Sequence, residues 1–166
     1  MATASCGVCG TASIEDLLRR CDPLPDGPLV EPAALTTIPA TLRAAQETFE
    51  STGGLHAAGL FDPDGRLLRA REDVGRHNAL DKLVGAAALA GLMPLHGTVL
   101  LVSGRVSFEL VQKAAVAGIA VLAAVGAPTD LAVDTAARVG MTLVGFLRGG
   151  RCNVYSRPDR LGIEAS

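Results

Sequence analysis

The segment from Val99 to Leu147, VLLVSGRVSFELVQKAAVAGIAVLAAVGAPTDLAVDTAARVGMTLVGFL, decides the fold of this chain. Short apolar runs alternate in it with stretches whose apolar side chains recur at helical spacing. Nearly continuous apolar strands joined by helices are typical of a sheet covered on both faces, so we expect a largely parallel sheet here. The predicted strands are Val99–Ser103, Ile119–Val125 and Met141–Leu147, and the predicted helices between them are Ser107–Ala117 and Asp130–Arg138.

The residues before this segment predict an opening hairpin. Leu55–Phe61 and Arg66–Arg71 flank Asp62-Pro63-Asp64-Gly65, where proline fits the second turn position and glycine the fourth. The order of elements then matches the three-layer α/β/α sandwich of cytidine deaminase-like folds, with a mixed sheet that opens with a hairpin. The remaining predicted elements are helices over Ala40–Ser51 and His77–Leu92 and a further strand over Asn153–Arg157.

The first residues are organised differently from this α/β pattern. Ser13 and Asp16 resemble an N-cap and its carboxylate partner, which predicts a short helix as far as Arg20. The stretch Cys21–Pro39 is rich in proline, aspartate and glycine and predicts an exposed linker or lid. We therefore expect a cysteine-bearing loop, short helix and linker over residues 1–38, and an α/β domain over residues 39–166.

Composition and charge exclude several classes of protein. Hydrophobic residues make up 49% of the 166-residue chain and charged residues 19%, which is enough apolar material for one folded domain. The net charge is −2 with scattered basic residues, which argues against nucleic acid as a partner. No basic start leads into an apolar run, so we expect a cytoplasmic protein. The apolar stretch Gly85–Gly104 is divided by Pro94, His96 and Gly97, so no membrane span is expected.

Two cysteines near the start form the most informative local pattern, Cys6-Gly7-Val8-Cys9-Gly10. Glycines around the second cysteine favour a mobile loop with an exposed thiol, whose pKa a neighbouring thiol or helix N-terminus can lower. The alternatives are half of a zinc site, a redox disulfide and two unreactive thiols. Zinc needs four ligands, and only the isolated Cys21, Cys152 and three histidines remain, so we expect no metal ion of the protein's own. A redox motif would lie between a strand and a helix, whereas this one precedes all strands, so a mobile carrier ranks first.

The turn between the hairpin and the next helix is a candidate ligand site. Backbone N–H groups and the helix dipole favour anions there. Arg76 can pair with phosphate, and Glu72 or Asp73 can accept from the two N–H groups on the Watson–Crick edge of guanine. The alternative is helix capping by Asp73 or Asn78 with an exposed arginine. The candidate contacts in this turn are Glu72, Asp73, Arg76, His77 and Asn78.

Two later strand-to-helix turns have the same dual interpretation. Gly104 permits close backbone approach, while Arg105 and Ser107 can contact phosphate, unless Ser107 caps the helix. Thr129 lies in the third such turn, so the three turns could form one pocket. Glu109 and Lys113 are expected to form a surface pair four residues apart. His56 can line the pocket of the deaminase-like fold without binding zinc, or it can be an ordinary strand histidine.

Several of these motifs together resemble the formate dehydrogenase accessory sulfurtransferase family, FdhD. The similarity runs from Cys6 almost to Arg160, and the number and order of its segments make it specific. The segments are Cys6-Gly-Val-Cys9-Gly, Thr52-Gly-Gly-Leu-His56-Ala-Ala, Glu72-Asp-Val-Gly-Arg-His-Asn-Ala-Leu-Asp-Lys82, Ser103-Gly-Arg-Val-Ser107, Ala127-Pro-Thr129, Ala132-Val133, Thr142-Leu-Val-Gly-Phe146 and Asn153-Val-Tyr155.

The resemblance implies a cytoplasmic, usually dimeric protein with a deaminase-like fold. It implies that Cys6 or Cys9 takes sulfur from a cysteine desulfurase as a persulfide. The sulfur then passes to the molybdenum bis-guanine-dinucleotide cofactor for formate dehydrogenase, with a guanine nucleotide bound in a pocket. Members of the family normally carry a further portion ahead of the cysteine loop, which here begins five residues after Met1.

Two other functions compete with sulfur transfer. A chaperone could hold the molybdenum cofactor while its thiols transfer nothing. A zinc deaminase would need a His or Cys ligand two residues before a glutamate and a Pro-Cys-x-x-Cys motif. Here His56 is followed by Ala57 and Ala58, and no second Cys-x-x-Cys occurs, so deaminase chemistry is not expected.

Overall fold

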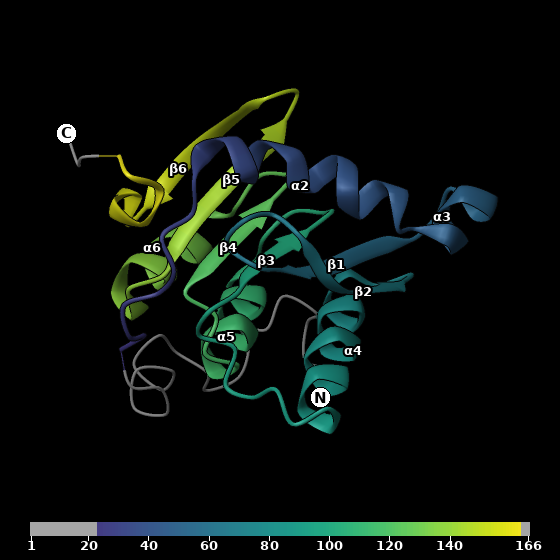
Figure 1. Ribbon diagram of the computed structural model, residues 1–166, viewed down its shortest axis with the longest axis horizontal. Coiled ribbons are helices and arrows are strands. Elements are labelled where there is room, and N and C mark those ends of the chain that lie inside the picture. Colours follow the sequence, from purple (N-terminus) through teal and green to yellow (C-terminus); the bar gives the residue numbers. More distant parts are fainter. Residues whose placement is uncertain (1–22, 164–166) are drawn as a thin grey trace, which may run out of the picture.

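The computed structural model describes residues 23–163 of the chain, and these form an α/β domain built on a mixed sheet (Figure 1). The predicted cysteine loop at Cys6 and Cys9 and the predicted helix Ser13–Arg20 lie outside the described residues. Among the described residues, none of the helices combines the length and the apolar character needed to cross a membrane.

The sheet has six strands in the order β2-β1-β3-β4-β5-β6. The three central strands β3, β4 and β5 are parallel, whereas β1 pairs antiparallel with β2 and β3, and β6 pairs antiparallel with β5. The predicted mixed sheet with an opening hairpin is therefore confirmed. The strands are β1 His56–Phe61, β2 Leu67–Asp73, β3 Val99–Val102, β4 Val121–Ala124, β5 Thr142–Arg148 and β6 Arg151–Ser156.

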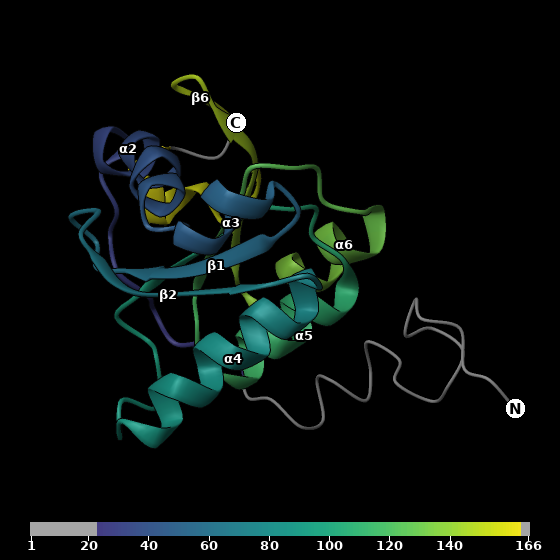
Figure 2. The ribbon, with the colours of Figure 1, turned by 90° about the vertical axis from the view of Figure 1, so that its right-hand side faces the viewer.

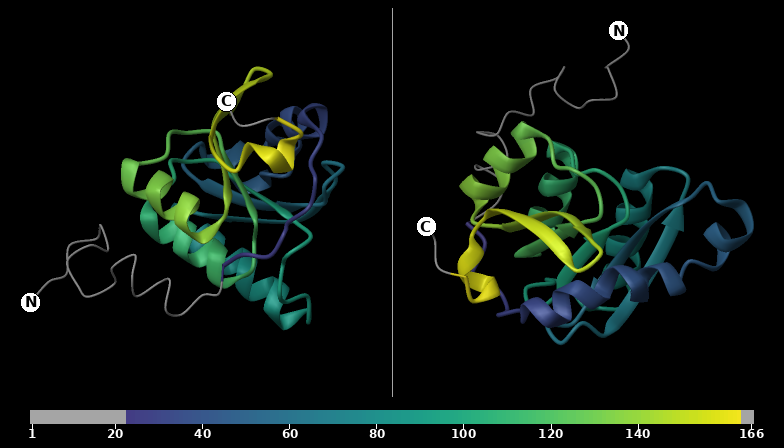
Figure 3. Two further views of the ribbon diagram at one scale, coloured as in Figure 1. Left: turned by 90° about the vertical axis from the view of Figure 1, so that its left-hand side faces the viewer. Right: turned by 90° about the horizontal axis from the view of Figure 1, so that it is seen from above.

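Helices cover both faces of this sheet, as predicted. Figure 2 shows α2 and α3 on one side of β1 and β2 and α4 and α5 on the other. Figure 3 places α6 with α5 and shows the β5–β6 hairpin projecting from the edge of the sheet. The helices are α2 Pro32–Ala44, α3 Glu47–Thr52, α4 Arg76–Leu89, α5 Phe108–Val116 and α6 Asp130–Val139, followed by a 3-10 turn, η1 Pro158–Leu161.

The continuous apolar strands are explained by two cores, one on each face. In β3, Leu100 packs with the residues of α4, α5 and α6, while its neighbour Leu101 packs with those of α2. In β5, Leu143 likewise belongs to the core beneath α4, α5 and α6, and Val144 to the core beneath α2. Because successive side chains of a strand point to opposite faces, a sheet buried on both faces needs apolar residues at every position.

The predicted linker was wrong from Pro32 onward, because α2 begins there and includes Pro39, and the predicted domain boundary near residue 38 falls inside this helix. Proline fits the first helical turn, where the backbone N–H has no partner within the helix. Pro39 is tolerated in the interior because Leu35, Ile38 and Leu42 are buried against the sheet. Tertiary burial thus outweighs the poor helix propensity of this segment.

The predicted helix Ala40–Ser51 is in fact two helices, which are separated at Ala45 and Gln46. Gln46 leaves the helical conformation at φ −90° and ψ 72° and becomes the N-cap residue of α3. This break turns α3 away from α2 and lets residues of both helices border one cavity.

Candidate functional site

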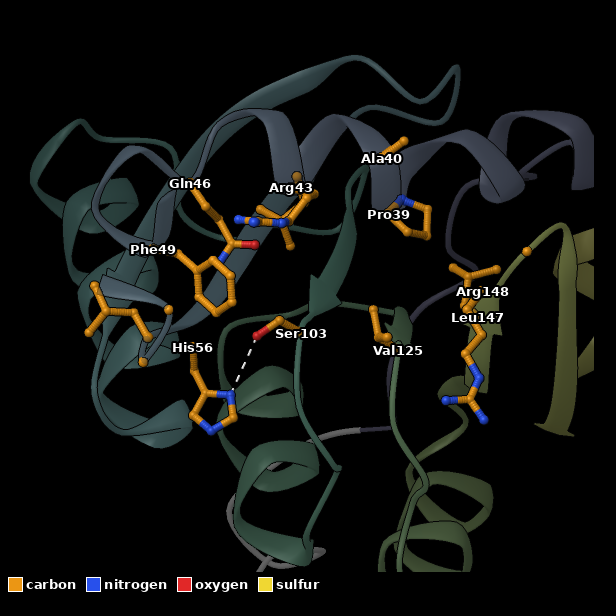
Figure 4. A pocket seen from close by; sticks show the side chains of 15 residues that line it. Pro39, Ala40, Arg43, Gln46, Phe49, His56, Ser103, Val125, Leu147 and Arg148 are labelled. Carbon is orange, nitrogen blue, oxygen red and sulfur yellow. Dashed lines mark hydrogen bonds between the residues drawn. The ribbon is translucent and has the colours of Figure 1, made fainter. Parts of the chain in front are cut away.

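A pocket of about 640 Å³ lies between α2, α3 and the end of the sheet (Figure 4). It lies on the face covered by α2, at the ends of β3, β4 and β5, where open α/β sheets commonly bind ligands. Its volume is in the usual range for small-molecule sites. The residues that line it are Pro39, Ala40, Leu42, Arg43, Gln46, Phe49, Gly53, Gly54, Leu55, His56, Ser103, Val125, Leu147, Arg148 and Gly149.

Gln46 is the most unusual of these residues because its polar side chain is only 5% exposed. Its Nε2 atom is buried and has no hydrogen-bond partner among residues 23–163. Buried amides are nearly always hydrogen-bonded, since an unpaired one costs roughly 1–3 kcal/mol. A polar ligand group in the pocket would supply the missing partner.

Phe49 supplies an aromatic ring beside Gln46 (Figure 4). The guanidinium carbon of Arg43 lies 4.1 Å from the centre of this ring, and Arg43 also pairs with Glu50 at 3.3 Å. The pocket therefore combines an aromatic ring, a free amide and positive charge, and none of its lining residues is acidic. This combination suits a planar ligand that carries an anionic group.

His56, at the start of β1, and Ser103, just after the end of β3, lie side by side in the lining of the pocket (Figure 4). The Oγ atom of Ser103 accepts a hydrogen bond of 2.9 Å from the backbone N–H of Ala57 and lies 3.5 Å from Nδ1 of His56. A Cβ atom at Gly104 would lie 3.1 Å from the same His56 nitrogen, so glycine is needed for this close approach. His56 thus lines this pocket, and its predicted contact with a cofactor stays a prediction.

The carboxylate of Glu72, a predicted guanine contact, is already engaged by α3. It accepts hydrogen bonds from the backbone N–H groups of Thr48 at 3.0 Å and Phe49 at 2.8 Å. These N–H groups lie in the first turn of α3, where a carboxylate complements the helix dipole. Glu72 does not line the pocket, so its role is to position Phe49.

Asp73 is also engaged, through both oxygens of its carboxylate. Oδ1 accepts from the backbone N–H of Gly75 at 3.0 Å and from the amide of Asn78 at 3.1 Å, and Oδ2 pairs with Lys82 at 2.5 Å. The hydrogen bond from Lys82, followed by those from Gly75 and Asn78, lowers the pKa of Asp73 to about 2. The N-cap residue of α4 is Gly75, which has no side-chain capping bond, so the predicted capping by Asp73 or Asn78 is not observed. Neither Asp73 nor Asn78 lines the pocket.

His77 and Ser107 meet on the opposite face of the sheet, at the first residues of α4 and α5. Nε2 of His77 lies 3.0 Å from Oγ of Ser107 and 3.8 Å from Oε2 of Glu109. Burial and the nearby positive charge of Arg76 lower the pKa of His77. Ser107 makes no side-chain hydrogen bond to the first turn of α5, so its predicted capping is not observed.

Three further sequence-based expectations have plain outcomes in the structure. The predicted pair of Glu109 with Lys113 was wrong, because Lys113 pairs with Asp81 at 2.6 Å. Thr129 caps α6 by accepting from the backbone N–H of Ala132 at 3.2 Å. Arg105 is exposed and, like Arg76, Ser107 and Thr129, does not line this pocket. Their predicted contacts with a cofactor stay predictions.

The part of the chain that the structure describes contains no group of three or more His, Cys, Asp or Glu side chains able to hold a metal ion. Cys152 is half-buried, and burial raises the pKa of its thiol. Sequence reasoning missed Gln46, Phe49 and Arg148 as pocket residues. Only the Arg148-Gly-Gly-Arg151 pattern gave a local signal, that of a tight hairpin turn.

The three layers and the pocket at the strand ends of a mixed sheet define an α/β protein whose cavity has the place and size common for small-molecule sites. Residues 1–162 match the family described as FdhD/NarQ, and this chain belongs to that family. It is 57% identical to the sulfur carrier protein FdhD of Streptomyces avermitilis and 56% identical to that of Streptomyces coelicolor. Each match covers 99% of this chain and 59% of the relative, so the chain spans about three fifths of their length.

A solved structure agrees with this assignment. The crystal structure of a candidate formate dehydrogenase accessory protein from Desulfotalea psychrophila is 31% identical, with a TM-score of 0.78. The match covers 89% of this chain and 62% of that protein. The family and its fold, a six-stranded mixed sheet flanked by helices, are therefore established for this chain, and the resemblance found in the sequence motifs is confirmed.

Proposed function

We propose that this chain is the sulfur-carrying and cofactor-binding part of a formate dehydrogenase accessory sulfurtransferase. Cys6 or Cys9 accepts sulfur from a cysteine desulfurase and delivers it to the molybdenum bis-guanine-dinucleotide cofactor of formate dehydrogenase. One guanine nucleotide of that cofactor binds in the pocket between α2, α3 and the sheet. The close relatives named as sulfur carrier proteins support the first part, and the lining of the pocket supports the second.

The observation that carries the nucleotide assignment is the unpartnered amide of Gln46 beside the ring of Phe49. An amide has both a donor and an acceptor, so it can donate to O6 of guanine and accept from N1–H. The ring of Phe49 offers a stacking surface for the base, and Arg148, at the other end of the pocket, lies where it can meet phosphate (Figure 4). Gln46 takes the role that the sequence suggested for Glu72 or Asp73.

The sulfur step needs a thiolate. The thiolate of Cys6 or Cys9 attacks the outer sulfur of the donor persulfide, so a new S–S bond forms while the old one breaks and the donor cysteine leaves as a thiolate. If the second cysteine then attacks the inner sulfur of the carried persulfide, a disulfide forms. The outer sulfur leaves as hydrosulfide for the cofactor to take up.

Intact mass spectrometry after incubation with a cysteine desulfurase and cysteine tests the carrier role. The wild-type chain should gain about 32 Da, the mass of one sulfur atom, as persulfide chemistry requires. The Cys6→Ala, Cys9→Ala double variant should gain none. Cys152→Ala is the matched control and should still gain it, because burial raises the pKa of Cys152 and disfavours its thiolate.

Equal adducts on the wild type and the double variant would contradict the carrier role. The binding-only alternative, a chaperone for the cofactor, predicts that the wild type accepts no sulfur while binding GDP. Calorimetry with GDP on the double variant separates sulfur acceptance from nucleotide binding.

A further inference from the structure

A cluster of polar side chains lies at the first residues of α4 and α5, which pack side by side on the face of the sheet opposite the pocket (Figure 2). Nε2 of His77 lies 3.0 Å from Oγ of Ser107 and 3.8 Å from Oε2 of Glu109. Arg76 is the residue next to His77 in α4. The proposed sulfur step needs a thiolate, so it also needs a group that takes the proton from the thiol.

Two buried atoms of this cluster have no hydrogen-bond partner among residues 23–163. They are Oε1 of Glu109 and Nε of Arg76. The guanidinium group of Arg76 makes no hydrogen bond or ion pair anywhere in that range. Buried polar groups are nearly always paired, since each unpaired one costs roughly 1–3 kcal/mol. Unpaired charged groups next to a histidine indicate a site that serves a reaction rather than one that only stabilises the fold.

The surroundings of His77 decide which of its ring nitrogens can accept a proton. A carboxylate beside Nε2 favours the tautomer with the proton on Nε2, because the negative charge of Glu109 attracts that N–H. In this tautomer Nε2–H donates to Oγ of Ser107, and the lone pair lies on Nδ1, which has no hydrogen-bond partner among the described residues. The side chain is 29% exposed, so a reacting group can reach the ring.

Four charged side chains around His77 influence how readily the ring takes a proton. Burial, the largest cause, and the nearby charge of Arg76 lower the pKa of His77. Lys113 lowers it too, whereas Glu109 and Asp81 raise it. The ring is therefore neutral at pH 7, which is the form that acts as a base. Once the ring is protonated, the carboxylate of Glu109 stabilises the imidazolium.

The thiols of Cys6 and Cys9 are within chain reach of this cluster. The backbone N–H of Leu24 donates to the carbonyl of Val139 at 3.1 Å, so the described chain starts at the C-terminal end of α6. A ten-residue helix such as α6 is about 15 Å long, and neighbouring helices lie roughly 10 Å apart. The 13 residues between Cys9 and Pro23 can span up to about 40 Å, which is enough to reach the start of α4.

We infer that His77 is the general base of sulfur acceptance and takes the proton from the thiol of Cys6 or Cys9. Ser107 and Glu109 are positioning residues that hold its ring. This inference rests on the proposed carrier role of the two cysteines. The S–H bond breaks, the proton moves to Nδ1 of His77, and the thiolate attacks the outer sulfur of the donor persulfide. A new S–S bond forms while the old one breaks, and the imidazolium returns the proton to the donor thiolate.

The rate of sulfur acceptance from glutathione persulfide, followed by intact mass spectrometry, tests this base. The small donor needs no desulfurase, so the pH dependence of the desulfurase does not enter. His77→Gln should slow acceptance roughly tenfold at pH 7, because a thiol with an ordinary pKa of about 8.5 is only about 3% ionised there. The deficit relative to the wild type should disappear above about pH 9.5, where the thiol ionises without a base. Imidazole added to His77→Ala should restore part of the lost rate.

His96→Gln is the matched control, because His96 lies beyond the other end of α5, where its ring contacts the carbonyl of Gly118. It should keep the wild-type rate at every pH. Glu109→Gln keeps the ring of His77 but removes the negative charge beside Nε2, so it should slow acceptance several-fold at pH 7. Thermal melting shows whether each variant is folded, and Glu109→Gln tests the same base if the His77 variants are not.

The possible outcomes separate this inference from the carrier role. Folded His77→Gln with the wild-type rate at pH 7 would overturn the general base and leave the carrier role intact. If the His77 variants do not fold, an unchanged rate in Glu109→Gln would count against the base in the same way. A wild type that gains no sulfur at Cys6 or Cys9 would overturn the carrier role, and the general base with it.

Discussion

The Oε1 atom of Glu72 lies 2.8 Å from the backbone nitrogen of Phe49, so the end of β2 holds the start of α3. This bond joins residues that are 23 positions apart in the sequence. It fixes the first turn of a six-residue helix that has no buried residues of its own. Since short helices are marginal without tertiary contacts, Glu72 decides where the ring of Phe49 lies in the pocket.

Glu72→Ala should therefore weaken the pocket more than the core. Removing two charge-assisted hydrogen bonds should lower the free energy of unfolding by roughly 1–3 kcal/mol and weaken GDP binding several-fold. Urea unfolding and calorimetry measure the two effects. Glu47→Ala, an exposed carboxylate in the same helix, is the control and should change both little. Unchanged GDP affinity in Glu72→Ala would contradict the positioning role.

The layers of this fold could be predicted from the sequence because the patterns that encode them are local. The strand around Leu100 and the helix around Val111 each display their own periodicity. The break at Gln46 could not be predicted in this way, because the carboxylate that caps α3 comes from Glu72. A capping partner in another element leaves no signal in the segment that it caps.

The same reason explains which site residues were found and which were missed. His56 was found because it lies at the start of a recognisable strand, and the structure places it in the pocket. Gln46 and Phe49 were missed because they lie in a sequence that resembles an uninterrupted helix. Asp73 was predicted to accept hydrogen bonds from a ligand. Its carboxylate instead pairs with Lys82, nine residues further along the chain. Whether a side chain is free to bind a ligand therefore depends on partners from other parts of the chain.

Substitutions of Gln46 should separate binding from base selectivity. Gln46→Leu fills the space without polar atoms and should weaken GDP binding by roughly 1–3 kcal/mol, because the base then loses its partner. Gln46→Glu should raise the preference for GDP over ADP. A carboxylate accepts from the two adjacent N–H groups of guanine, whereas an amide can turn over to suit either base. Calorimetry with both nucleotides measures these affinities. The same ratio of GDP affinity to ADP affinity in the wild type and both variants would count against Gln46 as the base contact.

Asp73 should give the fold an acid-sensitive component. Its pKa of about 2 in the folded chain lies below the ordinary 3.8, so the folded state favours the charged carboxylate. This contribution is fully present above about pH 4 and is lost as the pH falls through about 2. The stability difference between the wild type and Asp73→Asn should therefore shrink over that window. Urea unfolding at several pH values measures it, and a difference independent of pH would contradict the assignment.

His77 should remain neutral at pH 7. The folded state favours its uncharged form, whereas it favours the charged form of Asp73. Burial first and Arg76 second lower its pKa in the folded chain below 6.5, while Glu109 raises it. Arg76→Ala should therefore move the pKa of His77 upward, and Glu109→Gln should move it further down. The stability that the neutral ring contributes is present above about pH 6.5 and is lost as the pH falls. NMR titration of the ring protons measures each pKa, and a shift of the wrong sign in either variant would disprove the cause assigned to it.

Arg105 and Arg148 provide the sharpest comparison between sequence and structure. From its turn, Arg105 was expected to grip phosphate, so that Arg105→Ala would weaken nucleotide binding by roughly 1.5–3 kcal/mol. In the structure Arg105 is exposed, lies outside the pocket lining and has no ion pair with any residue from 23 to 163. Glu109, four residues further along the chain, lies beside His77. We therefore expect Arg105→Ala to change neither the melting temperature nor the affinity for GDP.

Arg148→Ala should behave differently, because Arg148 lines the pocket and has no carboxylate partner among the described residues. Its loss should weaken GDP binding by roughly 1.5–3 kcal/mol, the range for a charge-assisted hydrogen bond. It should not lower stability, since removing one of two opposed arginines relieves repulsion in the hairpin. Melting temperature and GDP affinity measured on both variants decide between the two arginines. If Arg105→Ala lost affinity and Arg148→Ala did not, the phosphate would bind at the strand-to-helix turn of Arg105 and not in the pocket.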